Sequence, residues 1–151
     1  MRIVEMKPED VLTIKNIEIQ NGLAEWKIED YLNAIKKNDH FTKIIKFENE
    51  IIGFIIARLI TIETERKYNT AEIYNIAIEK KHGKKGFGGL LLNNLFDNCR
   101  ESDISEIWLE VRKSNITAHG FYIKHGFEQI SERKNYYKHP VESAIIMKRE
   151  L

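Results

Sequence analysis

The stretch of sequence that decides the fold is Ile76-Ala77-Ile78-Glu79-Lys80-Lys81-His82-Gly83-Lys84-Lys85-Gly86-Phe87-Gly88-Gly89-Leu90-Leu91-Leu92. Within it an apolar strand ends, a turn rich in glycine and lysine follows, and an apolar helix begins. Glycine lets backbone N–H groups come close to a ligand, and the first turn of a helix carries partial positive charge. The lysines add positive charge at the same place. The stretch therefore predicts an anion site suited to a pyrophosphate.

The spacing of the glycines separates this turn from two other phosphate loops. It does not fit the Rossmann pattern G-x-G-x-x-G, and no Gly-Lys-Ser or Gly-Lys-Thr of a Walker loop occurs. Glycines and lysines also occur in ordinary solvated turns, and for the glycines alone that alternative stays open. The combination of strand, lysines and helix favours anion binding.

The composition of the whole chain predicts one globular domain over residues 1–151. Of these 151 residues, 42% are hydrophobic and 31% are charged, and a chain of this size buries roughly 70% of its unfolded surface. The 24 basic and 23 acidic residues leave a net charge of +1. Attraction of the whole molecule to nucleic acid or to a membrane is then weak. We expect neither direct nucleic-acid binding nor membrane binding.

Cysteine and histidine usage bears on compartment and metal content. Cys99 is the single cysteine, which excludes an internal disulfide and favours a reducing compartment. The N-terminus has no long apolar stretch, and the run Ile51–Ile60 is too short to span about 30 Å of hydrocarbon. The histidines show no metal-ligand spacing. We expect a cytoplasmic protein without a metal.

Hydrophobic periodicity and turn signals predict the element order β-α-α-β-β-β-α-β-α-β-β. This order is typical of an α/β fold in which helices cover both faces of a mixed sheet. The expected strands are Arg2–Lys7, Phe41–Phe47, Ile51–Ile62, Thr70–Ile78, Glu106–Val111, Glu128–Glu132 and Ser143–Lys148, and the expected helices begin at Pro8 or cover Lys27–Lys37, Gly86–Arg100 and Asn115–Lys124.

Six segments together carry a resemblance to a known family. They are Tyr74–Ile78 (YNIAI), Gly86-Phe87-Gly88, Ile107–Asn115 (IWLEVRKSN), Phe121–Phe127 (FYIKHGF), Arg133–Tyr137 (RKNYY) and Ala144–Met147 (AIIM). In order and spacing they resemble the GNAT superfamily of N-acetyltransferases and, within it, the bacterial ribosomal-protein alanine N-acetyltransferase branch (RimI type). The resemblance is strong from Thr70 to Met147 and weaker before it. Gly83 stands where the family loop Q/R-x-x-G-x-G/A usually has Gln or Arg.

The resemblance implies a fold, a co-substrate and a set of contacts. The implied fold is a single-domain GNAT fold with a mixed, mostly antiparallel sheet of about seven strands. The implied co-substrate is acetyl-CoA, and the acceptor is the N-terminal α-amine of a protein, in first place a ribosomal protein that begins with alanine. The residues expected to contact acetyl-CoA are Ile76, Ala77, Ile78, Lys84, Lys85, Gly86, Phe87, Gly88, Gly89 and Asn115. Asn115 could also cap the following helix.

Glu110 and Tyr122 are the predicted catalytic residues. On a strand, Glu110 shares one face with Trp108, and the resemblance implies that Glu110 accepts a proton. It likewise implies that Tyr122 donates one to the leaving thiolate. The alternatives are an ion-paired strand glutamate and a tyrosine that only packs in the core.

Trp26, Tyr136 and Tyr137 are the predicted substrate-binding residues. The two tyrosines resemble the family's substrate-side loop, and Trp26 would face them across the entering peptide; surface aromatics on a loop are the alternative. We expect a monomer or weak dimer.

Two other functions remain open at this stage. One keeps the chemistry and changes the acceptor to a small-molecule amine. The other is a non-catalytic CoA-binding sensor or ribosome-associated module, against which the presence of both Glu110 and Tyr122 argues.

Overall fold

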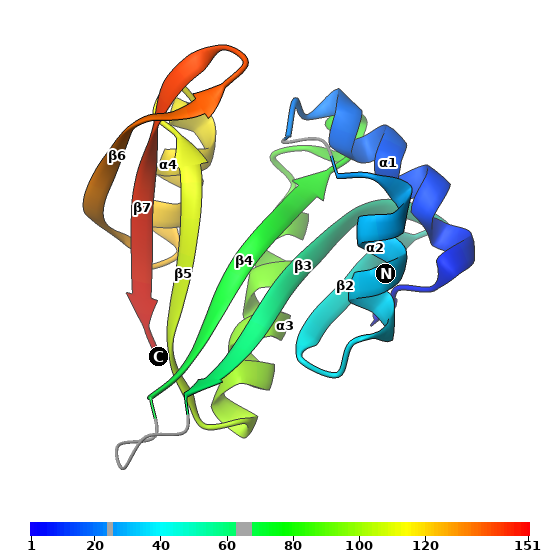
Figure 1. Cartoon of the computed structure of the whole chain (residues 1–151). Coiled ribbons are helices and arrows are strands. Elements are labelled where there is room, and N and C mark those ends of the chain that lie inside the picture. The colour runs from blue at the N-terminus through cyan, green and yellow to red at the C-terminus, as the bar shows by residue number, and fades with distance from the viewer. Residues whose placement is uncertain (24–25, 63–67) are drawn as a thin grey trace.

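The computed structural model describes residues 1–23, 26–62 and 68–151. Within them one sheet has the strand order β1-β2-β3-β4-β5-β7-β6 (Figure 1). The elements are β1 (Arg2–Glu5), the 3-10 turn η1 (Pro8–Asp10), α1 (Val11–Gln20), α2 (Ile28–Lys36), β2 (His40–Phe47), β3 (Glu50–Ile62), β4 (Tyr68–Ile78), the 3-10 turn η2 (Lys80–His82), α3 (Phe87–Glu101), β5 (Ile104–Arg112), α4 (Ile116–Lys124), β6 (Glu128–Lys138) and β7 (Val141–Glu150). This confirms the predicted order and the α/β class.

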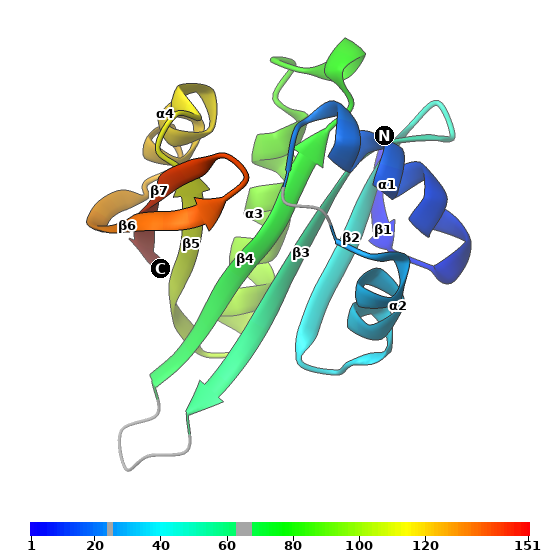
Figure 2. The ribbon, with the colours of Figure 1, turned by 45° about the horizontal axis from the view of Figure 1, so that its top comes forward.

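The sheet is mixed and mostly antiparallel, as predicted. Only β4 and β5 run parallel among the described pairs. One core packs α3 and α4 against the sheet through residues such as Leu91 and Tyr122. A second core packs α1 and α2 on the opposite face through residues such as Ile14 and Tyr31. Helices therefore cover both faces (Figure 2).

The site is positioned by the parting of β4 and β5. Their ladder ends at the pair Ile73–Leu109, while β4 continues to Ile78, and the two strands diverge beyond this point (Figure 1). On its other side β4 stays paired with β3, with a bulge at Tyr74 because Ile56 pairs with Asn75 and Ala57 pairs with Ile73. The end of β4 thus offers β5-facing backbone groups that have no strand partner.

Two hairpins test the local predictions. From sequence, Glu48-Asn49-Glu50 predicts a hairpin turn between the strands now seen as β2 and β3. Glu48 and Asn49 have φ values of 49° and 70°, the positive values that a tight hairpin turn needs, and this prediction is confirmed. The prediction for β6 was too short: the strand runs to Lys138 rather than ending at Glu132. Tyr136 and Tyr137 therefore lie in a strand and not in a loop. A register shift between Arg133 and Tyr137 interrupts the pairing with β7 there. The sequence of this segment therefore lacks the regular alternation of side chains by which a strand is recognised.

Candidate active site

A cleft of about 1170 Å³ opens where β4 and β5 part. It brings together residues from β4, the start of α3, β5 and α4, which lie far apart in the sequence. Of the predicted site residues, the cleft is lined by Ile76, Ala77, Ile78, Lys84, Gly86, Phe87, Gly88, Gly89, Glu110, Asn115, Tyr122 and Tyr137. Lys85, Tyr136 and Trp26 are not among its lining residues.

The glycine turn presents free backbone donors to this cleft. Gly86 has a φ of +87° and precedes the first residue of α3, a conformation that favours glycine. The Leu90 N–H reaches back to the Gly86 carbonyl at 3.2 Å. The N–H groups of Phe87, Gly88 and Gly89 come before that first helical bond and have no acceptor within the helix. This turn is the predicted anion cradle.

Gly88 has a packing role in addition to the cradle role that the sequence predicts. A Cβ atom on Gly88 would lie 3.1 Å from the Phe121 ring, so this position lets α3 and α4 approach each other. A Cβ on Gly89 would lie 2.8 Å from Nε2 of His125 on the same helix. The missing side chains of these two glycines therefore allow close helix packing. Only their backbone N–H groups are candidates for contact with a ligand.

Asn115 has a structural role that the structure shows directly. Its Oδ1 accepts the Ala118 N–H at 3.1 Å, which caps α4 as predicted. The residue also lines the cleft. The cap and a ligand contact through the amide nitrogen are compatible.

Glu110 lies on β5 with its side chain 23% exposed, and its Oε1 is 3.2 Å from Nη1 of Arg133. The negative charge of Glu110, followed by burial, raises the pKa of Tyr136. Burial, followed by that charge, raises the pKa of Tyr137. The indole of Trp108 donates instead to Glu106, at 3.1 Å. The carboxylate therefore lies among one arginine and the two tyrosines of β6.

Tyr122 projects from α4 and is only 8% exposed. Burial, with a smaller contribution from Tyr137, raises the pKa of its hydroxyl. The group therefore keeps its proton at neutral pH, and the residue lines the cleft. Its ring packs against Phe121 and Phe127 at centroid distances of 5.3 and 5.4 Å. Tyr122 therefore packs in the core, as the alternative interpretation expected, and also lines the cleft.

Sequence reasoning missed Glu72 and Arg133. Glu72 pairs with Trp108 just before the β4–β5 ladder ends. Burial, followed by the charge of Glu110, raises its pKa. Alternation along β4 places Glu72 and Tyr74 on one face, which was the available signal. Arg133 stood inside the quoted RKNYY segment, but only the tertiary structure brings it to Glu110.

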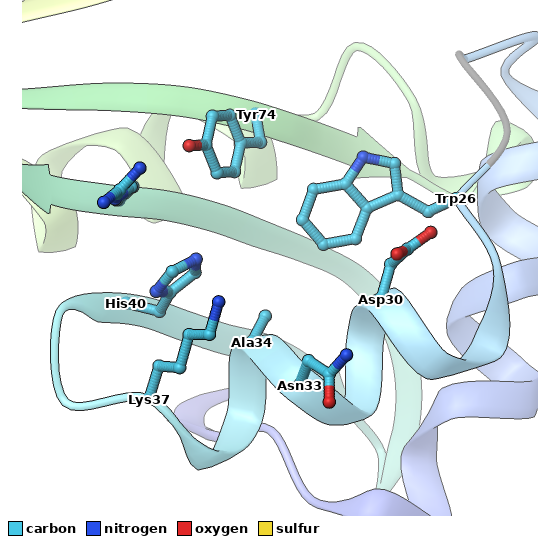
Figure 3. Close-up of a pocket in the computed structure, with 8 residues that line it drawn as sticks. Trp26, Asp30, Asn33, Ala34, Lys37, His40 and Tyr74 are labelled. Carbon is cyan, nitrogen blue, oxygen red and sulfur yellow. The ribbon is translucent and has the colours of Figure 1, made fainter.

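Trp26 lies in a second, smaller pocket of about 280 Å³ on the α2 side of the sheet. Its ring and that of Tyr74 line this pocket (Figure 3), with their centroids 5.7 Å apart. Tyr74 and Leu23 line the large cleft. Residues 24 and 25, the middle of the loop before Trp26, lie outside the described residues. Among the described residues, Tyr74 is the one that lines both pockets, and it connects Trp26 to the cleft.

Comparison with known families decides the identity of this fold. The model of the acetyltransferase (GNAT) family matches residues 11–127. The chain belongs to the GNAT family. This GNAT acetyltransferase is 34% identical over 148 residues to a Haemophilus influenzae protein named [ribosomal protein bS18]-alanine N-acetyltransferase, which covers 96% of this chain and 95% of that protein. The Escherichia coli protein of the same name is 36% identical over 143 residues, covering 89% and 95%.

Solved structures share the fold of this GNAT acetyltransferase. The E. coli ribosomal-protein-S18-alanine N-acetyltransferase superposes with a TM-score of 0.84 at 24% identity, over 99% of this chain and 92% of that one. Arabidopsis thaliana Naa50, in complex with the bisubstrate analogue CoA-Ac-MVNAL, superposes with a TM-score of 0.85 at 24% identity, over 99% and 98%.

Two kinds of feature are absent from the described residues. Within them, no cluster of three or more His, Cys, Asp or Glu side chains is arranged to hold a metal ion. In that same part of this GNAT acetyltransferase, no helix is long and apolar enough to cross a membrane.

Proposed function

We propose that this GNAT acetyltransferase transfers the acetyl group of acetyl-CoA to the N-terminal α-amine of a protein, in first place a ribosomal protein that begins with alanine. The observation that carries the proposal is the meeting of Glu110 and Tyr122 in one cleft where β4 and β5 part. Two relatives that match this chain over most of its length carry the name of that activity.

The residues present fit acetyl-CoA. The free N–H groups at the start of α3 and the cation of Lys84 suit a pyrophosphate, and Lys85 adds charge to the same turn. The edge of β4 at Ile76–Ile78, which has no strand partner on the β5 side, suits the amide groups of a pantetheine arm, which can bond to it as a strand would. When bound, acetyl-CoA supplies a thioester carbonyl open to attack by an amine.

The chain's own groups manage two protons. Releasing the proton of an α-amine with a pKa of about 7.8 costs about 1 kcal/mol at pH 7, whereas a lysine costs about 4.6 kcal/mol. A carboxylate is therefore a sufficient base for an N-terminus. Glu110 takes the proton that the amine loses, and the buried Tyr122 hydroxyl donates one to the departing sulfur. Tyr136 and Tyr137 flank Glu110 and are placed to line the entry of the peptide.

The same proposal extends to the setting of the enzyme. A ribosomal substrate and a single buried cysteine support work in the cytoplasm. We infer that residues 1–151 act as one N-acetyltransferase domain, as a monomer or weak dimer, without a metal.

Mass spectrometry of acetylated peptides tests the proposal. The protein and acetyl-CoA are mixed with N-terminal peptides that differ in their first two residues, and each peptide is also offered with its α-amine blocked and one internal lysine free. We expect acetylation of the free α-amine, fastest for alanine, and little at lysine. A panel of polyamines and amino compounds is run in parallel. Acetylation of that panel and of no peptide would replace the protein acceptor with a small amine.

A further inference from the structure

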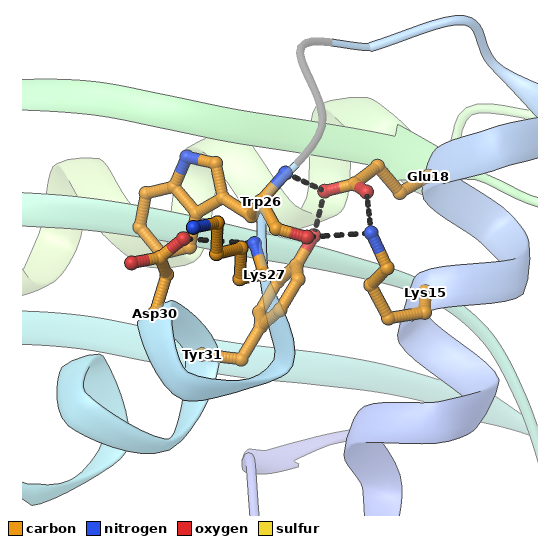
Figure 4. Close-up of polar contacts among 6 residues, drawn as sticks. All are labelled: Lys15, Glu18, Trp26, Lys27, Asp30 and Tyr31. Atoms are coloured by element: carbon orange, nitrogen blue, oxygen red, sulfur yellow. Dashed lines mark hydrogen bonds and ion pairs between the residues drawn. The ribbon is translucent and has the colours of Figure 1, made fainter.

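Among the described residues, the most completely buried carboxylate on the α1–α2 face lies outside the reaction site. Glu18 of α1 has no exposed surface, and three donors surround it (Figure 4). Lys15 Nζ lies 2.7 Å from its Oε1, the Trp26 N–H donates to its Oε2 at 3.3 Å, and the Tyr31 hydroxyl donates to the same oxygen. Burial, followed by the bond to Glu18, raises the pKa of Tyr31, so this hydroxyl keeps the proton that it donates.

These groups hold both polar atoms of one residue's backbone. While Glu18 accepts from the Trp26 N–H, Lys15 donates to the Trp26 carbonyl at 2.5 Å. A buried or half-buried backbone group left without a partner costs free energy comparable to a lost hydrogen bond. The start of the same loop is tied as well, because Asn21 Nδ2 donates to the carbonyl of Ile78, at the end of β4, at 3.1 Å. The loop before α2 is thus fixed at each end.

Stability alone does not explain a buried ion pair here. Taking two charges out of water costs several kcal/mol per ion, and apolar residues of similar volume are often as stable or more stable. The pair does, however, fix the position of Trp26, whose ring packs against Tyr31 and Tyr74 at centroid distances of 5.2 and 5.7 Å. Tyr74 in turn lines the reaction cleft. A path of direct contacts therefore runs from Glu18 to the acceptor side of the cleft.

We propose that Glu18 and Lys15 are positioning residues that clasp the backbone of Trp26 and thereby set the affinity for the acceptor peptide without touching it. This inference rests on the proposed function, since it takes the acceptor to be a peptide. The clasp holds the wall that Trp26 and Tyr74 form. Its loss is expected to loosen that wall, while the glycine turn at the start of α3, which neither Glu18 nor Lys15 contacts, is unaffected.

The first experiment reads the position of Trp26 without any substrate. Trp108, the other tryptophan, is replaced by phenylalanine, and quenching of Trp26 fluorescence by acrylamide is measured with and without Glu18→Gln. Because Glu18→Gln could fail to fold, the apolar triple variant Lys15→Met, Glu18→Leu, Tyr31→Phe is made as well. We expect at least about twofold stronger quenching in both, since the half-buried indole becomes free to move. Unchanged quenching overturns the proposal.

The second experiment separates positioning from chemistry. For the same variants with Trp108 retained, we expect the KM for the peptide to rise about tenfold, as the loss of one or two hydrogen bonds predicts, with kcat and acetyl-CoA affinity within about twofold. Lys15→Arg keeps the positive charge and its N–H donors, so this variant should retain most of the wild-type affinity for the peptide. Asp97→Asn, which breaks the exposed pair Asp97–Arg100 with the same i,i+3 spacing on α3, is the matched control and should change neither value.

The outcomes distinguish this inference from the proposed function. If quenching rises but the peptide KM does not, Trp26 is clasped without serving the acceptor, and the inference is wrong while the acetyltransferase proposal stands. If the wild-type protein acetylates no peptide at all, the proposed function fails, and with it the acceptor role of the clasp. The quenching measurement then still decides whether Glu18 and Lys15 hold Trp26.

Discussion

Glu110 has two charged neighbours of opposite sign. Arg133 forms an ion pair with its Oε1 at 3.2 Å, and Glu72 lies near enough that burial, followed by the charge of Glu110, raises the pKa of Glu72. An arginine that is 55% exposed can move away at little cost because exposed ion pairs contribute about 1 kcal/mol or less. The approach of a substrate to Glu110 therefore requires only a small rearrangement of β6.

Glu110→Gln keeps the shape of the side chain and removes the base. We expect kcat/KM to fall by about 10²–10⁴-fold, with a flatter acidic limb in the pH profile than the wild-type enzyme shows on the same peptide. Glu106→Gln on the same strand is the control, since Glu106 pairs with Trp108 and Lys148 instead. Full activity of Glu110→Gln across roughly pH 6–9 would return Glu110 to a structural role.

Tyr122→Phe removes a hydroxyl whose pKa is raised by burial and leaves the ring in place. We expect kcat to fall, by about 10²-fold or more for a lost general acid, while calorimetry finds acetyl-CoA affinity nearly unchanged. Thermal unfolding checks that the packing against Phe121 and Phe127 survives. An unchanged kcat would leave Tyr122 as a core residue only.

At the scale of the element, two nearby glycines at the start of α3 have different roles. Gly86 supplies a positive φ, and Gly88 makes room for Phe121. The first property shapes the turn that offers N–H groups, whereas the second lets α4 lie against α3. Substitutions at the two positions should therefore fail in different assays.

Gly86→Ala should weaken acetyl-CoA binding by about tenfold, because a left-handed conformation costs an L-residue roughly 1–2 kcal/mol and the turn will shift to relieve it. Gly88→Ala should instead lower Tm by a few degrees, the size expected for about 1 kcal/mol in a chain of this length. Calorimetry and thermal unfolding measure the two effects. A larger loss of acetyl-CoA affinity in Gly88→Ala than in Gly86→Ala would contradict this division.

The irregular end of β6 carries Tyr136 and Tyr137, the residues that we expect to meet the peptide. Joint replacement of Tyr136 and Tyr137 by alanine should raise the KM for the peptide and spare that for acetyl-CoA, because both rings lie near Glu110 and away from the glycine turn. Steady-state kinetics with each substrate varied in turn provides the measurement. An equal rise in both KM values, or a loss of folding alone, would indicate a packing role such as the stacking of Arg112 on Tyr137.

At the scale of the whole molecule, Cys99 reports on global unfolding. It is fully buried in the core between α3 and the sheet, and burial raises the pKa of its thiol to about 11 from 9.0. A thiol reagent at pH 8 should therefore react only as fast as the fold opens, and acetyl-CoA at 100 times its Kd should slow the reaction about a hundredfold. Fast labelling of the folded protein would contradict this.

The same thiol predicts the alkaline stability of the protein. Because the folded state holds the Cys99 proton more tightly, its contribution is fully present below about pH 9 and is lost as the pH rises toward 11. Denaturant unfolding of the wild type and of Cys99→Ala should show that only the wild type loses this contribution over that window. Parallel pH dependence of the two would refute it.

The sequence by itself determined the features of this protein that depend on local interactions. Hydrophobic period and turn residues specify the element order, the hairpin at Glu48-Asn49 and the glycine turn before α3, because each depends on neighbours a few residues away. The resemblance placed Glu110 and Tyr122, and the structure brings them into one cleft. Only the tertiary structure placed Arg133 beside Glu110, Phe121 over Gly88 and the Glu18 carboxylate under Trp26. Those contacts join side chains from separate elements, and sheet order, register shifts and packing decide them rather than any local pattern.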